Sequence, residues 1–353
     1  MDREPAAVCP VPTELNQNAS VHCPFQGVDM LVVVDNSGSM AEEQEVLATS
    51  FFTLVNSLID PLLGWKYPPA DDVRIAVVSS DMGLQWGGKP YEAGDGWPND
   101  AIPCQSAGDN GGFQTYGSGK TIDLRHDAIP CDEDGSQCPD GWTCGGIGAD
   151  PDHPEWGLCQ APDGDGSNQQ CPGLAATWAE TPIGSTDPEP NPDLPFQVAC
   201  LSSLGTDGCG FEQQLQAAAV GLHRDDQNTF VRPSALLSVM VVSDEEDCSI
   251  ESNELFAAPE IQDQSLGQIN IACGENEQHL YPTETLYDTF VSAKDGRKDA
   301  VVFASIVGVP DGDDSPCQGA GHEIGDCLDA DEMQKTPQLE NDAWFYRPAC
   351  SRF

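Results

Sequence analysis

The sequence predicts an α/β domain with a doubly wound, mostly parallel sheet and a large disulfide-rich insertion. Three observations carry this prediction. Short runs of bulky apolar residues lack period-2 alternation, which is typical of parallel strands buried on both faces. Segments with helical spacing of apolar residues alternate with these runs. Between residues 83 and 199 both patterns stop, and glycine, proline and cysteine become frequent.

The first half of the domain contains two predicted strands and one helix. Met30–Val34 is an apolar run that suits a buried strand. A helix follows from Glu42, with apolar side chains at helical spacing, and Asp60-Pro61 ends it. Val73–Ser79 is predicted to be a second strand that is half-buried at its start and fully buried at its end.

An insertion is expected at residues 83–199, where dipeptides such as Gly-Gly, Trp-Pro and Asp-Gly recur. Because a structureless loop of this length is improbable inside a compact domain, we expect disulfides to hold it. The cysteines available for this are Cys104, Cys131, Cys138, Cys144, Cys159 and Cys171. An α/β domain of this type still needs one strand and one helix in this region, and the pattern does not assign their positions.

Regular periodicity returns in the second half of the domain. A helix is predicted over Phe211–Arg224 and a continuous buried strand over Ala235–Ser243. A further helix is expected over Thr283–Ala293, with its first residue as N-cap, and a further buried strand over Ala300–Val309. The chain therefore divides into an extended proline-rich leader, a split domain, the insertion and an irregular acidic C-terminal segment: 1–27, 28–82 with 200–309, 83–199, and 310–353.

The composition limits the function and the location. The formal net charge is −45, from 59 acidic and 14 basic residues, which argues against binding to nucleic acid or to anionic membranes and favours cation binding. An acidic proteome from a salty habitat explains this charge equally well. The 15 cysteines form no Cys-x-x-Cys pair, so a disulfide framework and an oxidising compartment are expected.

The chain is therefore expected to be secreted or held at the cell surface. No apolar run reaches the roughly 18 residues of a membrane span. Met1–Pro5 lacks the basic start and apolar core of a signal peptide, so we expect the true start to be missing or removed. A lipid anchor on the full-length protein is compatible with this expectation.

Oxygen-bearing side chains follow the first predicted strand directly. Asp35, Ser37 and Ser39 come after Val34, and Gly38 allows the chain to turn tightly between them. Open α/β sheets bind their ligands at the carboxyl ends of strands. Oxygen ligands suit a hard divalent cation, so this loop is a candidate metal site.

The segment Asp35–Ser39 resembles Asp-x-Ser-x-Ser, the first loop of the metal-ion-dependent adhesion site of von Willebrand factor A domains. Thr206 falls where that family supplies its metal-binding threonine, just before a predicted helix. Asp244 falls where the family supplies its second aspartate, usually within Thr-Asp-Gly. Here Ser243 replaces the threonine and Glu245 the glycine, which bears on the shape of the loop rather than on the ligand.

The resemblance implies a fold and a way of binding. It implies a von Willebrand A, Rossmann-like sheet in which Ser37, Ser39 and Thr206 bind Mg²⁺ directly, with Ca²⁺ or Mn²⁺ as alternatives. Asp35 and Asp244 would act mainly through water. One coordination position would remain for an Asp or Glu of a protein partner, because neutral direct ligands leave the ion electrophilic.

The nearest resemblance is to exported, cysteine-rich A-domain proteins of myxobacteria. Gly208–Gln213 and Asp244–Ser249 look like additional signatures of those proteins. In the wider family, some members couple the metal site to the movement of a C-terminal helix. Gln334–Phe345 shows no sustained apolar period, so we expect no such coupling here.

The expected function is a metal-dependent adhesion or protein-binding module on a bacterial surface, and not an enzyme. Ser37 and Ser39 have no evident base, no Gly-x-Ser-x-Gly elbow is present, and the six histidines have no metal-ligand spacing. One alternative is a structural cell-envelope protein in which the metal only stabilises the loops. Another is a metal-assisted hydrolase.

Two further acidic patterns and one glycine-rich pattern are weaker evidence for a binding site. Asp132, Asp134, Asp163 and Asp165 lie in incomplete calcium-loop strings that lack the final glutamate, so solvated turns are favoured. Asp244–Asp247 suits either a second, calcium-type ion or a solvated loop. Gly117–Thr121 lacks the first glycine of a phosphate loop and is rejected as one.

Overall fold

The computed structural model describes residue 25 and, with gaps, residues 27–90, 108–181 and 194–307. The gaps are 63–68, 71, 84, 87–88, 118, 125–128, 133–134, 136, 140, 148–155, 161–168, 175, 253, 256–257 and 259–271. Most of the predicted leader and the predicted C-terminal segment lie outside the described residues. The same holds for Cys104, Asp134, Asp163 and Asp165.

A five-stranded sheet forms the centre of the fold, in the order β10-β2-β1-β11-β12. Its parallel strands are β1 (Val28–Val34), β2 (Val73–Ser79), β11 (Leu236–Ser243) and β12 (Val301–Val307). The short β10 (Ala179–Glu180) pairs with β2 in the antiparallel direction. The prediction of a mixed α/β fold with a mostly parallel sheet is confirmed.

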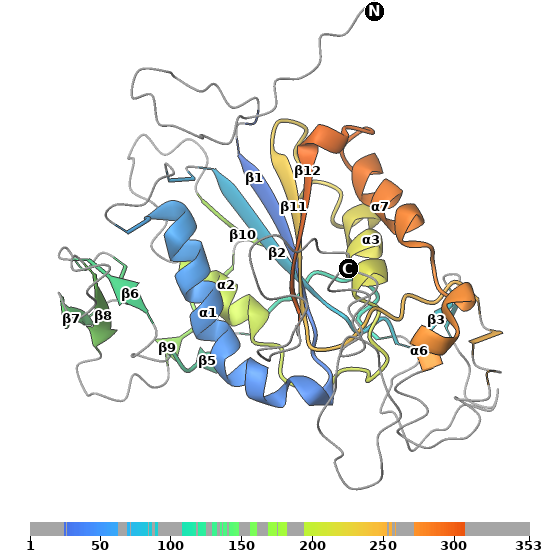
Figure 1. Cartoon of the computed structure of the whole chain (residues 1–353). Helices are drawn as coiled ribbons and strands as arrows, with labels where there is room; N and C mark the ends of the chain where they lie inside the picture. The colour runs from blue at the N-terminus through green and yellow to red at the C-terminus, as the bar shows by residue number, and fades with distance from the viewer. Residues whose placement is uncertain are drawn as a thin grey trace, which may run out of the picture.

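Helices cover both faces of this sheet (Figure 1). One face carries α1 (Ala41–Ile59) and α2 (Leu194–Ser202), and the other carries α3 (Gln214–His223) and α7 (Thr283–Ser292). Shorter helical turns are η1 (Gly38–Met40), α6 (Ala272–Glu275), η3 (Glu277–His279) and η4 (Lys298–Ala300).

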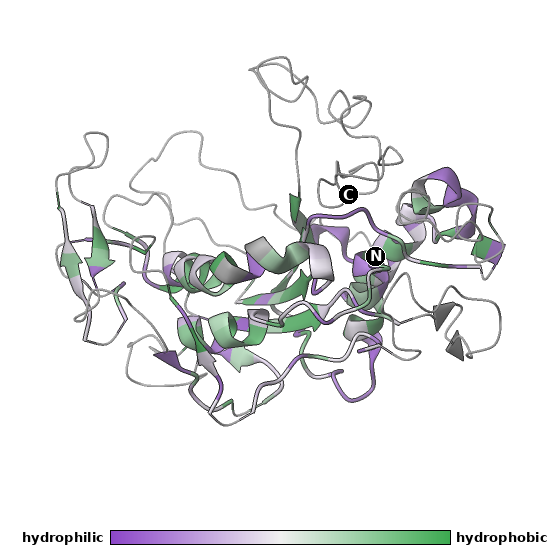
Figure 2. Ribbon diagram, turned by 90° about the horizontal axis from the view of Figure 1, so that it is seen from below, coloured by the Kyte–Doolittle hydropathy of each residue, from purple (hydrophilic) through white to green (hydrophobic). Residues whose placement is uncertain are grey.

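Strand β1 is buried on both faces, as its apolar run predicts. Leu31 and Val33 pack in the core on the α3 side, whereas Val32 and Val34 pack in the core on the α1 side. All four side chains have no exposed surface. Hydrophobic residues are concentrated in the central strands and in the helices beside them (Figure 2).

The insertion supplies β10 and α2, the strand and helix whose positions the sequence pattern leaves open. Helix α2 starts at Leu194, inside the range expected for the insertion, and seven of its nine residues are buried. A helix that is apolar on nearly every side has no amphipathic period, which is why the periodicity does not reveal it.

The described part of the insertion forms one small three-stranded sheet and two pairs of short strands. A small sheet of β6 (Pro130–Cys131), β8 (Gly157–Gln160) and β7 (Thr143–Gly145) lies beside α1 on the side away from the central sheet (Figure 1). Two-stranded pairs are formed by β3 (Gln85–Trp86) with β4 (Lys89–Pro90), and by β5 (Thr121–Ile122) with β9 (Gln169–Gln170).

Four disulfides join described cysteines. Cys131–Cys144 and Cys138–Cys159 are local to the small sheet, as predicted. Cys171–Cys200 ties the insertion to α2, and Cys248–Cys273 lies in the second half of the domain. Such a framework is typical of proteins in an oxidising compartment. Across the described segments, no helix combines the length and the apolar character needed to cross a membrane.

Three local predictions are wrong. Strand β12 is not buried on both faces, because it is an edge strand and Val302 and Ile306 are 45% and 58% exposed. Helix α7 has Pro282, not Thr283, at its N-cap, with no side-chain capping bond. Helix α3 starts three residues later than predicted, at Gln214.

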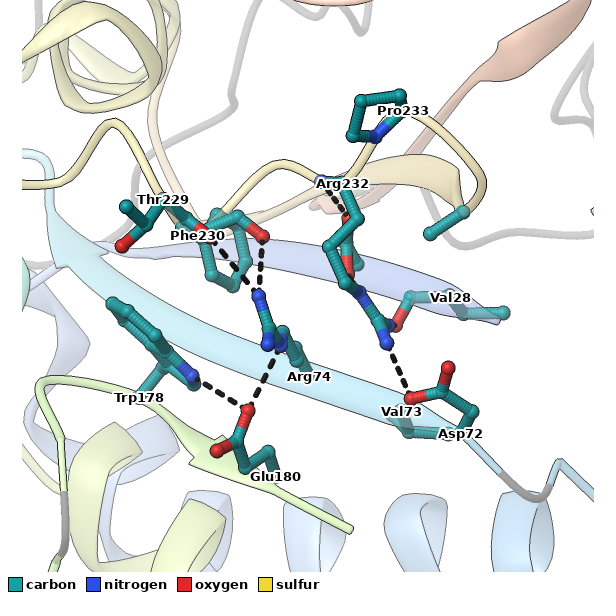
Figure 3. A network of polar contacts seen from close by, with 12 residues as sticks. Val28, Asp72, Val73, Arg74, Trp178, Glu180, Thr229, Phe230, Arg232 and Pro233 are labelled. Carbon is teal, nitrogen blue, oxygen red and sulfur yellow. Dashed lines mark hydrogen bonds and ion pairs between the residues drawn. The ribbon is translucent and has the colours of Figure 1, made fainter. Parts of the chain in front are cut away.

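Ion pairs fasten the amino edge of the sheet, where the parallel strands begin (Figure 3). The Arg232 guanidinium contacts Asp29 at 2.7 Å and also Asp72. The Arg74 guanidinium lies 2.8 Å from Glu180 of β10. The Lys294 ammonium donates to the carbonyls of Arg232 and Ala235. These contacts stabilise the edge opposite to the candidate site.

Candidate metal centre

The candidate residues lie at the carboxyl edge of the sheet, where the polypeptide leaves β1 and enters α1. Asp35 N donates to Val242 O at 2.9 Å and Ser80 N donates to Val34 O at 3.1 Å. The loops that follow β1, β2 and β11 are therefore neighbours. This follows from the parallel register, which places Val34 beside Ser79 and Val242.

Asp35 is fully buried and its carboxylate accepts three hydrogen bonds. Oδ1 accepts from Ser37 N at 2.9 Å and from Ser80 Oγ at 3.1 Å, and Oδ2 accepts from Ser243 Oγ at 2.6 Å. Burial raises the pKa of the Asp35 carboxyl, while the bonds from Ser243 and Ser37 act against that shift. Donors on both oxygens favour the ionised form.

Ser37, Ser39 and Asp244 form a continuous row of oxygen atoms next to Asp35. Ser37 Oγ lies 2.8 Å from Ser39 Oγ, and Ser39 Oγ donates to Asp244 Oδ1 at 3.1 Å. Ser39 and Asp244 are 205 positions apart in the sequence. The fold thus brings together four of the five residues that the sequence singles out.

Thr206 lies in a loop that packs against the first loop. Gly208 N donates to Asn36 O at 2.8 Å. A Cβ on Gly208 would lie 2.3 Å from Asn36 Oδ1, so a side chain there would displace the Asn36 amide. Thr206 is half-buried, two residues from this contact. Within the described residues, its side chain forms no hydrogen bond with the other four candidates.

The electrostatics of the row favour a cation. The pKa of Asp244 is raised from 3.8 to about 8, first because the carboxyl is desolvated and then because Asp35, Glu245 and Glu43 carry like charge. The hydrogen bond from Ser39 lowers it only in part. In the described part of the chain, neither Asp35 nor Asp244 forms an ion pair with lysine or arginine. A divalent cation beside these carboxylates would stabilise their charged forms.

The described cations lie elsewhere. Most of them gather at the amino edge: Arg74, Arg232, Lys294, Arg297 and Lys298. Arg224, at the end of α3, donates to the carbonyl of Asn110 at 3.1 Å. Lys120 is different, because its ammonium donates to the carbonyls of Cys200 and Ser203 at 2.6 and 2.7 Å, at the end of α2. Among the described residues, the basic side chains are therefore concentrated away from the Asp35 and Asp244 carboxylates.

Part of the acidic string after β11 has a structural role. Asp247 is fully buried, and its Oδ1 accepts from Leu215 N at 3.0 Å. Ser249 Oγ accepts from Gln216 N at 2.9 Å. These two side chains satisfy the first N–H groups of α3, which explains why the helix starts at Gln214.

The sequence reasoning misses two side chains around Asp35. Ser80 was not singled out, although it directly follows β2 as Asp35 follows β1. Gln214 was not singled out either, and its Nε2 donates to Ser243 Oγ at 2.8 Å. No periodicity identifies Gln214, because it is a polar residue at a helix start.

A thiolate metal site is not favoured. Among the described residues, the one group of three histidine, cysteine or carboxylate side chains close enough to share an ion is Cys131, Cys138 and Cys159. All three are in disulfides. At the candidate centre the donor set is two carboxylates and serine hydroxyls, which suits Mg²⁺, Ca²⁺ or Mn²⁺ rather than a soft metal.

Comparison of the chain with protein-family models, with curated proteins and with solved structures found no match. The resemblance to A domains therefore depends on the motifs and on the geometry described above.

Proposed function

We propose that this chain is a von Willebrand A-type domain that binds a divalent cation at its carboxyl edge and uses it to engage an acidic group of a protein partner. Mg²⁺ is the first candidate, with Ca²⁺ or Mn²⁺ as alternatives. The observation that carries the proposal is the hydrogen-bonded row of Ser37, Ser39 and Asp244 beside the buried Asp35.

The chemistry of the row supports an open coordination position. Two carboxylates balance the charge of one divalent cation. The serine hydroxyls, with Thr206 from the neighbouring loop, are neutral ligands that leave the ion electrophilic. An incoming carboxylate from a partner then gains much of the attraction. The disulfides are consistent with a secreted or cell-surface location, at which such a partner would be met.

The first alternative is a structural role. The loops after β1, β2 and β11 already contact one another through direct hydrogen bonds to Asp35, so an ion could serve only to stabilise them. A hydrolase is less well supported, because neither described histidine side chain forms a hydrogen bond or ion pair with Asp35, Ser37, Ser39 or Asp244. His223 contacts Thr289 and Ser292 of α7, and His279 lies in η3 near Glu254. We therefore propose a binding protein rather than an enzyme.

Paramagnetic relaxation tests the open position directly. The protein is titrated with Mn²⁺, and the relaxation of the methyl protons of added acetate is measured. We expect bound Mn²⁺ to enhance acetate relaxation in the wild type, and Asp35→Ala to lose Mn²⁺ binding. Asp207→Ala is the matched control, because this exposed aspartate lies in the loop of Thr206 and is not a proposed ligand.

The two readouts separate the candidates. Absence of Mn²⁺ binding by the wild type would exclude the proposed site. Tight Mn²⁺ binding without any effect on acetate would favour the structural role over adhesion.

A further inference from the structure

Gln214, the first residue of α3, has an unusual arrangement of hydrogen bonds. Its side chain is fully buried. The amide Nε2 donates to Ser243 Oγ at 2.8 Å, whereas Oε1 is buried and has no hydrogen-bond partner among the described residues. A buried amide oxygen without a partner is costly. We therefore ask what the hydrogen bond from Nε2 to Ser243 contributes.

Ser243 connects this amide to Asp35. Its hydroxyl has one proton and two lone pairs. Two N–H groups point to the oxygen, from Gln214 at 2.8 Å and from Glu245 N at 3.1 Å. Two acceptors are in reach of the proton, Asp35 Oδ2 at 2.6 Å and Glu245 O at 3.2 Å. The carboxylate is both nearer and charged, so the proton goes to Asp35.

The orientation of the Gln214 amide decides whether that proton is available. If the amide were turned by half a rotation, Oε1 would face Ser243 and compete for the same proton. Donation by Nε2 removes that competitor and leaves the hydroxyl to Asp35. The price is the unpartnered Oε1 on the other side of the amide.

Gln214 is also held firmly in place. Asp247 and Ser249 accept from the next two backbone N–H groups of the helix, at Leu215 and Gln216. Gln213 N donates to Ser80 O at 3.1 Å, one residue beyond β2. The start of α3 therefore cannot shift without moving the loops that surround Asp35.

We propose that Gln214 is a positioning residue of the metal centre, which acts through Ser243 to orient the Asp35 carboxylate for the cation. This inference rests on the proposed metal site and not on the identity of the partner. Residues that orient a metal-associated group typically change metal affinity by 10- to 100-fold when they are removed.

The test is calorimetric titration of Mg²⁺ and Mn²⁺ into the wild type, Gln214→Met, Ser243→Ala and the double variant. Methionine has nearly the volume of glutamine and cannot donate. We expect Gln214→Met to weaken binding by about 10-fold. Because Gln214 acts through Ser243, the double variant should bind no more weakly than Ser243→Ala alone.

Gln137→Met provides the matched control. Gln137 is another buried glutamine, and the hydrogen bonds of its side chain to other described residues are with Asp132 in the insertion. This variant should lower the melting temperature and leave metal affinity unchanged, which separates a loss of packing from a loss of positioning.

Three results would overturn the inference. Gln214→Met could bind metal with the affinity of the wild type. The losses of metal affinity in Gln214→Met and Ser243→Ala could multiply in the double variant, or Gln137→Met could lose as much metal affinity as Gln214→Met. If Gln214→Met does not fold, Ser243→Ala alone must weaken binding, and unchanged affinity there overturns the relay. A wild type that binds no metal excludes the proposed function as well. Metal binding that depends on Gln214, without an effect on acetate, excludes only the adhesion role.

Discussion

Replacing Asp244 with asparagine should stabilise the metal-free protein and also abolish its response to Mg²⁺. The pKa of Asp244 is raised from 3.8 to about 8 by burial and by the neighbouring carboxylates. Each unit of such a shift corresponds to about 1.4 kcal/mol, so ionising this carboxyl costs the folded state at most about 6 kcal/mol. Because Asp244 is partly exposed, water reduces the penalty, and we expect a gain of about 2 kcal/mol for the variant.

The sign of the pH dependence follows from the direction of the shift. The pKa of Asp244 is higher in the folded state than in the unfolded state. The stability that this carboxyl contributes is therefore fully present below pH 3.8 and is lost as the pH rises towards about 8. The advantage of Asp244→Asn should therefore be larger at pH 9 than at pH 5.5. A gain of about 2 kcal/mol raises the melting temperature of a domain of this size by roughly 4–8 °C.

Thermal melts in EDTA and in Mg²⁺, at both pH values, check this prediction. For the wild type, Mg²⁺ at 100 times its dissociation constant should add about 2.7 kcal/mol, and for the variant it should add nothing. Asp207→Asn serves as control and should leave both responses unchanged. Equal melting temperatures of variant and wild type at pH 9 in EDTA would refute the argument from buried charge. A Mg²⁺ shift retained by the variant would refute the role of Asp244 at the site.

Three further predictions concern the loops and the disulfides. Gly208→Ala should weaken metal binding by titration and lower the melting temperature, because its Cβ would lie 2.3 Å from Asn36 Oδ1; an unchanged affinity would show that the loop of Thr206 does not contribute. Thiol titration of the unfolded, unreduced protein should find most of the 15 cysteines oxidised, and a majority of reactive thiols would contradict the disulfide framework. Amide exchange should slow around Ser37, Thr206 and Asp244 when Mg²⁺ is added and stay unchanged beyond residue 309; a large change in 330–353 would disprove the absence of coupling to the C-terminus.

The sequence was sufficient to locate the central strands and the residues of the candidate site. An apolar run such as Leu31–Val34 favours a strand in a parallel sheet, so the strand can be located without tertiary information. The polar residues that end these runs, Asp35 after β1 and Asp244 after β11, must meet at one edge when the strands are parallel. That the two aspartates also lie beside each other depends on the pairing of β1 with β11, which the tertiary structure decides.

The sequence does not predict features that depend on how strands and helices pack against one another. Strand β12 has the same apolar character as β1, and only its place at the edge of the sheet leaves Val302 and Ile306 exposed. Helix α2 is buried on nearly all sides, so no amphipathic period reveals it.

The division between sequence and tertiary structure is clearest around Asp35. The identity of the oxygen-bearing residues, and their position after buried strands, was determined by local sequence because backbone and burial preferences act over a few residues. The partners of Asp35 were decided by the fold: Ser243 is the last residue of β11 and Ser80 directly follows β2. Gln214, which binds Ser243, comes from a helix start. Hydrogen bonds between residues far apart in the chain depend on packing, which local sequence patterns do not predict.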